Sequence, residues 1–220
     1  MSIRGPSSGY GPVSRLRLVL ATANPDKVAE IVDIVSACAG ERVELVVCPE
    51  GTVEVEETGD TLEENARLKA SALVELTGMP AVADDTGLEV DALGGAPGVC
   101  SSRYAGMAGK YDENVTKLLA ELEAAGATTE KDRRARFRTV TVACFPDGHE
   151  VLADGVVEGV IAFERRGAGG FGYDPVFVPA GHEQTFAEMQ PQQKHAISQR
   201  GRAFRALVIA LLEDVDSRGA

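Results

Sequence analysis

The stretch Pro80–Val90, PAVADDTGLEV, carries an apolar run directly into two adjacent acids, Asp84 and Asp85. PAVAD has the pattern of a buried strand, and LEVDAL after it predicts a second short strand. Like charges at the end of a buried strand raise the pKa of a carboxyl group unless a cation lies nearby. The pattern therefore predicts carboxylates delivered to a metal ion or a lysine, whereas an isolated DDTG would favour a solvated turn.

Alternating strand and helix patterns precede this stretch. Strands are expected over 16–22 and 43–49, with a helix between them that carries apolar residues at helical spacing. Thr61 and Glu64 form a capping box, which opens a helix that runs to about Thr77.

Farther along the chain, a helix is expected over 112–125 and a hairpin of two longer strands over 137–163. A last helix is expected from about Ile197 to Val215. Early strand–helix–strand units followed by a hairpin predict an α/β fold with a sheet of mixed direction, flanked by helices.

Composition favours a single globular domain over 16–220, preceded by a leader, 1–15, that is rich in glycine, proline and serine and is expected to be disordered. The net charge of −12, from 34 acidic and 22 basic residues, argues against a nucleic-acid partner. No apolar run approaches the roughly 20 residues of a membrane helix. The four cysteines occur singly and are interpreted as buried, reduced thiols, so a cytoplasmic protein is expected.

Lys69 lies in the middle of an apolar stripe on the helix that follows Thr61. Its neighbours at helical spacing are Leu62, Ala66 and Leu73. A lysine in this place either extends past the core to water or points into a cleft, where an anion offsets its charge.

Two loops have the composition of ligand-binding segments. In ATANPDK, Asn24 and Lys27 lie between a strand end and a helix start, where backbone N–H groups favour a phosphate; helix capping alone also explains the motif. In GGFGYD, glycines adjoin Phe171 and Tyr173, which could stack on a base, although a hairpin loop is the alternative.

Five segments occur in a fixed order: ATANPDK, EETGDTLEENARLKA, AVADDTGLEVDALGGAPGVCSSRYAG, GGFGYDPVFVP and KHAISQRGRA. Together they resemble the inosine triphosphate pyrophosphatase family, which hydrolyses non-canonical purine nucleoside triphosphates such as ITP, dITP and XTP to the monophosphate and pyrophosphate. The resemblance covers nearly everything from Leu16 onward. It implies an elongated α/β fold of two lobes around a mixed sheet, with the nucleotide in the central cleft, and a homodimer.

The resemblance also implies the roles of individual residues. Asp85 would be the base, Glu56 and Asp85 would serve Mg²⁺, and Lys27 and Lys69 would stabilise the leaving pyrophosphate. The expected substrate contacts are Thr22, Ala23, Asn24, Pro25, Asp26, Lys27, Thr86, Phe171, Gly172, Tyr173, Asp174, Lys194, Gln199 and Arg200.

One position departs from the family pattern. The family usually has His-Arg after the A-[IV]-S tripeptide, whereas this chain has Gln199 before Arg200. Two rivals remain: a Maf-type pyrophosphatase for modified pyrimidine nucleotides, whose serine- and arginine-rich opening is missing here, and a nucleotide-binding module without catalysis.

Overall fold

The computed structural model describes residues 15–47, 55–106 and 110–218. Its centre is a seven-stranded sheet of mixed direction, which confirms the expected α/β class. The strand order is β2 (Val43–Val47), β1 (Leu16–Leu20), β3 (Ala81–Val90), β5 (Arg134–Cys144), β6 (Glu150–Ile161) and β7 (Phe177–Pro179), with β4 (Pro97–Gly98) paired to β3. β1 runs parallel to β2 and β3, and the remaining pairs are antiparallel.

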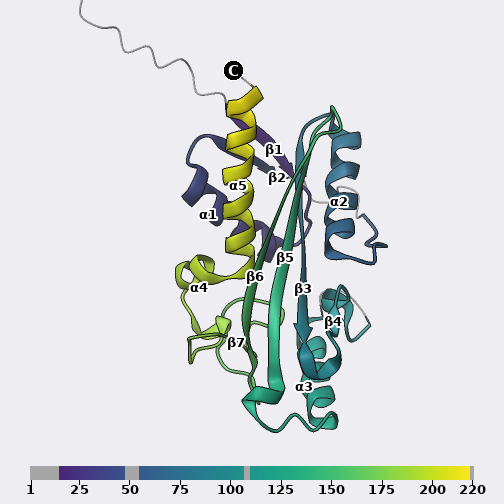
Figure 1. The fold of residues 1–220 in the computed structure, drawn as a ribbon, viewed down its shortest axis with the longest axis vertical. Coiled ribbons are helices and arrows are strands. Elements are labelled where there is room, and N and C mark those ends of the chain that lie inside the picture. Colours follow the sequence, from purple (N-terminus) through teal and green to yellow (C-terminus); the bar gives the residue numbers. More distant parts are fainter. Residues whose placement is uncertain (1–14, 48–54, 107–109, 219–220) are drawn as a thin grey trace, which may run out of the picture.

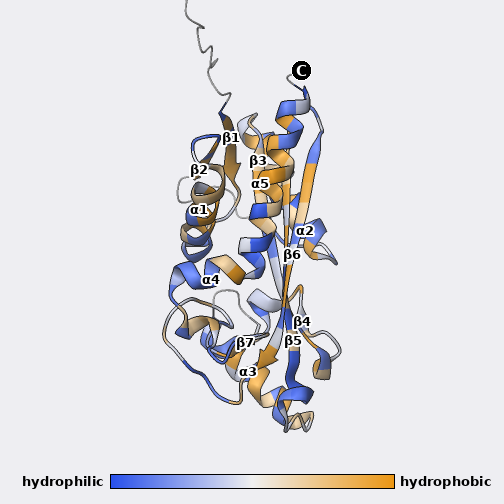
Figure 2. Cartoon of the chain, turned by 60° about the vertical axis from the view of Figure 1, so that its left-hand side comes forward, coloured by the Kyte–Doolittle hydropathy of each residue, from blue (hydrophilic) through white to orange (hydrophobic). Residues whose placement is uncertain are grey.

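Helices cover both faces of the elongated sheet (Figure 1). In the upper half of that view, α1 (Pro25–Ala39) and α5 (Gln199–Arg218) lie on one side of the sheet and α2 (Leu62–Thr77) lies on the other. In the lower half lie α3 (Tyr111–Ala124) and α4 (Pro191–Ile197). Hydrophobic residues run along α5 and the neighbouring strands (Figure 2), and the buried hydrophobic residues of the described chain form three clusters.

Local sequence signals account for the helix ends. Asn24 caps α1 by accepting the N–H groups of Asp26 and Lys27, with Pro25 in the first turn. The predicted capping box of Thr61 and Glu64 is confirmed at the start of α2, and Gly78 ends that helix in the left-handed conformation with φ +66°.

The prediction of two short strands on either side of the paired acids is wrong. β3 is a single ten-residue strand, and Asp84 and Asp85 lie in its middle, where they pair with Thr141 and Val140 of β5. The sequence DDTG forms no turn because the long hairpin of β5 and β6 continues the ladder past it.

The last helix differs from its predicted span of Ile197–Val215. Ser198 is extended, with φ −64° and ψ 156°, so the segment divides into α4 and α5. Gly201 allows the two helices to meet at this break, because a Cβ atom there would lie 2.0 Å from the backbone oxygen of His195. The break places Gln199 and Arg200 in the first turn of α5, where both are buried.

The sequence also led to expectations about the leader, the cysteines and membrane-spanning helices. The leader lies outside the described residues, apart from Arg15, and so does Cys48. Cys144 is buried, but Cys38 and Cys100 are exposed. None of the helices in the described ranges is long and apolar enough to span a membrane.

Gly155 of β6 allows α5 to approach the sheet closely. A Cβ atom at this position would lie 2.3 Å from the backbone oxygen of Gln199 and 2.5 Å from the backbone nitrogen of Ala203. Gly155→Ala is therefore expected to lower the free energy of unfolding by about 2 kcal/mol, because neither backbone atom can move aside without shifting α5. Urea denaturation measures this change.

Glu158→Ala, at an exposed position of the same strand, is the control and is expected to stay within about 0.5 kcal/mol of the parent. Equal stability of the two variants would contradict the packing explanation.

Candidate active site

The alternation of β3 sends the two neighbouring acids to opposite faces of the sheet. Asp84 meets Lys27 of α1 and Arg200 of α5, whereas Asp85 meets Asn65 and Lys69 of α2. The two carboxylates are therefore separate groups with separate partners.

Asp84 is a fully ionised anchor for two cations. Its Oδ2 atom lies 3.3 Å from Lys27 Nζ and 3.2 Å from Arg200 Nη2, and it accepts a hydrogen bond from Thr86 Oγ1 at 3.2 Å. Burial opposes ionisation, but Lys27 and Arg200 together hold the pKa of Asp84 well below its ordinary value. The other oxygen, Oδ1, is buried without a hydrogen-bond partner in the described part of the chain.

Asp85 has the opposite electrostatic character. Burial raises its pKa above the ordinary value, although Lys69 and Lys27 partly offset this. Lys69 Nζ lies 3.3 Å from Asp85 Oδ1, and Asn65 Nδ2 donates to Oδ2 at 3.3 Å. Asn65 is held in this orientation because its own side-chain oxygen accepts the N–H of Gly59 at 2.8 Å. A buried carboxyl group with a raised pKa is suited to accept a proton.

Lys69 points into the site, which settles the alternative that the sequence left open. Its ammonium contacts Glu57 Oε1 at 2.7 Å as well as Asp85. Arg103 Nη1 lies 3.2 Å from the other oxygen of Glu57. Glu56, the residue expected from the resemblance to serve a metal, is exposed, and its neighbour Glu57 takes the position beside Lys69.

A second group of buried charges lies at the junction of α1, α4 and α5. Glu30 accepts hydrogen bonds from Lys194 and Arg200, and Lys194 Nζ also contacts Asp174 Oδ2 at 2.6 Å. The ring of Phe171 lies beneath both cations, 4.9 Å from Lys194 Nζ and 5.4 Å from Arg200 Cζ. The glycine-rich loop therefore carries its aromatic residue to the same charged cluster.

Most of the residues expected from the sequence lie in or beside these two groups. Tyr173 differs, because its ring is buried in the lower core and its hydroxyl donates to the backbone oxygen of Ser101 at 2.9 Å. Gln199 is only 3% exposed, and its Oε1 atom has no hydrogen-bond partner within the described ranges.

Sequence reasoning missed three residues of these two groups: Glu30, Asn65 and Arg103. Glu30 had a usable signal, since an acid three residues after Lys27 on the buried face of α1 needs a partner. Asn65 likewise interrupts the apolar stripe of α2. The residues that pair with these side chains lie far from them in the sequence.

Comparison with known proteins decides the family. The Ham1 family profile matches residues 18–210. The chain belongs to the Ham1 family. It is 46% identical over 190 residues to the dITP/XTP pyrophosphatase of Desulforamulus reducens, which covers 86% of this chain and 92% of that protein. The resemblance inferred from the sequence motifs is thereby confirmed.

Solved structures of Ham1 proteins agree. A HAM1 protein from Coxiella burnetii is 41% identical and superposes with a TM-score of 0.80, covering 90% of this chain and 99% of that one. A structure described as a nucleoside-triphosphatase / dITP/XTP pyrophosphatase from Mycobacterium abscessus is 42% identical with a TM-score of 0.68, covering 87% and 97%.

Glu30 provides a test of the buried charge network in this Ham1 protein. Although burial opposes its ionisation, Arg200 and Lys194 hold the pKa of Glu30 below its ordinary value. Glu30→Gln is expected to lower the free energy of unfolding at pH 7 by about 3 kcal/mol, because it leaves two buried cations short of an anion. Denaturant titration with circular dichroism measures the difference.

The pH dependence gives an independent check. A depressed pKa contributes stability above the unfolded-state value of about 4.3 and loses it as the pH falls through that value and below. The difference in the free energy of unfolding between wild type and Glu30→Gln should therefore become smaller below about pH 4. Glu75→Gln, on the exposed side of α2, is the matched control. A constant gap at all pH values would contradict the ionic explanation.

Proposed function

We propose that this chain hydrolyses dITP, ITP and XTP to the nucleoside monophosphate and pyrophosphate, and so removes deaminated purine nucleotides. The observation that carries the proposal is Asp85, a buried acid with a raised pKa, held between Lys69 and Asn65. The names of the relatives, dITP/XTP pyrophosphatase, support the same activity.

The two groups of buried charges, one around Asp85 and Lys69 and the other around Glu30 and Lys194, would bind the two ends of a nucleoside triphosphate. The phosphates would lie at the Thr22–Lys27 loop with Lys69, where a helix start and two lysines offer positive charge. The nucleoside would lie against Phe171, near Lys194 and Arg200. One substrate would thus extend from one charged group to the other.

The two acids that contact Lys69 are suited to bind Mg²⁺. No set of three or more His, Cys, Asp and Glu side chains able to hold a metal occurs among the described residues. Mg²⁺, however, commonly takes one or two carboxylates and completes its shell with water and substrate phosphate. Glu57 and Asp85 both contact Lys69 and so converge on one place. We propose these two as the ligands, with Glu57 replacing the earlier candidate Glu56.

The reaction follows from these positions. A water oxygen attacks the α-phosphorus, Asp85 accepts a proton from that water, and the bond from the α-phosphorus to the bridging oxygen breaks. Lys27 and Lys69 would stabilise the negative charge of the departing pyrophosphate. Bound Mg²⁺ would supply further positive charge at the phosphate oxygens.

The active protein is proposed to be a homodimer, which light scattering in solution would test.

Asp85→Asn tests the proposed chemistry. Wild type with Mg²⁺ should release pyrophosphate rather than orthophosphate from ITP, and excess EDTA should abolish turnover. The variant should lose at least about 100-fold in kcat, the usual scale for removal of a general base. Asp33→Asn, an exposed change on α1, is the control and should retain full activity. Orthophosphate as the product, or less than about a tenfold loss in Asp85→Asn, would refute the assignment.

Gln199 should loosen the discrimination against ATP. Hypoxanthine presents an acceptor oxygen at its 6-position and adenine presents an amino donor, so side chains that only donate reject adenine. The buried Oε1 atom of Gln199 is an acceptor without a partner among the described residues, and it can accept a hydrogen bond from the adenine amino group.

Gln199→His should therefore raise the ratio of kcat/KM for ITP to that for ATP by about fivefold or more, the value of one hydrogen bond. Steady-state kinetics with both nucleotides measures the ratio. Gln192→His, an exposed change in α4, should leave it unchanged. A constant ratio in Gln199→His would mean that Gln199 plays no part in base selection.

A further inference from the structure

Tyr111, the first residue of α3, joins two segments that lie far apart in the sequence. Asn24 Nδ2 donates a hydrogen bond to its hydroxyl oxygen at 2.9 Å, and that hydroxyl in turn lies 3.4 Å from Asp26 Oδ2. Its ring lies 5.8 Å from the ring of Phe171, centroid to centroid, with the planes tilted by 41°. One side chain thus touches both the Thr22–Lys27 loop and the glycine-rich loop.

The hydroxyl of Tyr111 holds the capping side chain of α1. Asn24 Oδ1 accepts the backbone N–H groups of Asp26 at 3.0 Å and Lys27 at 3.3 Å, so its NH₂ group must face the other way, toward Tyr111. Without the hydroxyl, the amide loses the partner that fixes its rotation. The backbone N–H groups at this helix start are the groups available to a phosphate, so their order depends on Tyr111.

The ring of Tyr111 supports Phe171. Gly170 and Gly172 on either side of Phe171 have φ of +68° and +63°, and the backbone of Phe171 is held by hydrogen bonds to Asp174, so the backbone is fixed while the ring depends on its own contacts. Tyr111 and Phe171 line a cavity of about 570 Å³ together with the glycine-rich run 167–172 and the start of α3. Ring contact with Tyr111 therefore limits where Phe171 can present its face.

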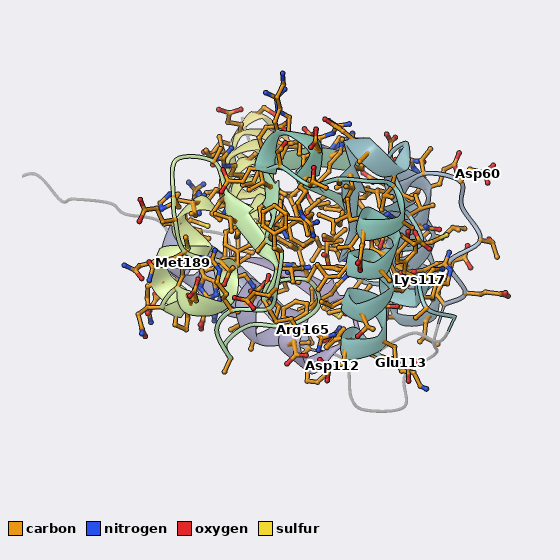
Figure 3. All side chains as sticks on the ribbon, turned by 90° about the horizontal axis from the view of Figure 1, so that it is seen from below. Asp60, Asp112, Glu113, Lys117, Arg165 and Met189 are labelled. Carbon is orange, nitrogen blue, oxygen red and sulfur yellow. The ribbon has the colours of Figure 1, made fainter. Side chains whose placement is uncertain are left out.

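Tyr111 itself is held by an anchored helix end. Arg165 donates to Asp112 Oδ1 at 2.9 Å, to the backbone oxygen of Asp112 at 2.6 Å and to Thr116 Oγ1 at 2.8 Å. In Figure 3, Asp112, Glu113 and Arg165 lie together at this end of α3. The first turn of α3 is thereby tied to the segment between β6 and the glycine-rich loop.

We propose that Tyr111 is a positioning residue that couples the two ends of the substrate site: its hydroxyl orders the phosphate loop through Asn24, and its ring orders the base-stacking face of Phe171. The inference rests on the proposed function for the assignment of the two loops. Tyr111 acts through its neighbours in both the ground state and the transition state, so its loss weakens binding and leaves the chemical step unchanged.

Two substitutions separate the two contacts. Tyr111→Phe removes only the hydroxyl, so binding of inorganic tripolyphosphate in Mg²⁺ buffer, measured by calorimetry, should weaken about fivefold, with a similar rise in KM for ITP and kcat within about twofold. Tyr111→Leu also removes the ring, so product inhibition by IMP should weaken by a further threefold or so beyond that in Tyr111→Phe.

Tyr104→Phe is the matched control, because the Tyr104 hydroxyl donates to Glu121 rather than to the phosphate loop. It should bind tripolyphosphate and IMP as wild type does. If Tyr111→Phe also matches wild type, the hydroxyl coupling is overturned, and equal IMP inhibition in Tyr111→Phe and Tyr111→Leu overturns the role of the ring. Failure of tripolyphosphate to bind wild type would instead refute the phosphate-loop assignment of the proposed function.

Discussion

The matching of buried charge is the constraint on which this structure depends. An isolated buried charge is costly, yet β3 carries two acids through the middle of the sheet. Cations reach them from different helices: Lys27 from α1, Lys69 from α2 and Arg200 from α5. The same helices must therefore dock in the register that brings their cations to β3, so the charge pattern and the packing specify one arrangement together.

The pairing of opposite charges continues outward from β3, with cations and carboxylates in alternation. Beyond Lys69 come Glu57 and Arg103, and beyond Arg200 come Glu30, Lys194 and Asp174. Each cation of the series already has a protein carboxylate. A polyphosphate that draws Lys69 to its own oxygens would leave Asp85 without that cation and Glu57 with Arg103 alone, and two carboxylates short of positive charge favour a divalent ion. Substrate and metal would thus assist each other's binding.

Sequence reasoning reached most of the elements, and most of the candidate residues that lie in or beside the two charged groups, because both depend on local signals. The capping box at Thr61, the loop at Asn24 and the glycine run before Phe171 are of this kind. The long strand β3 was divided in two because paired acids are rare inside a strand, and the cation that resolves the conflict, Arg200, lies 116 residues away. Glu30 was missed for the same reason, since its partner Lys194 is 164 residues distant.

A single step along β3 separates two electrostatic environments. Asp84 faces Lys27 and Arg200, which keep it ionised, so it serves to hold cations. Asp85, one residue on, faces α2, where burial raises its pKa and Asn65 fixes its orientation. Neighbouring carboxyl groups whose environments push their pKa values apart are the usual sign of distinct roles in one site. The alternation of β3 is therefore the basis for proposing that the second acid of the pair, and not the first, takes a proton from water.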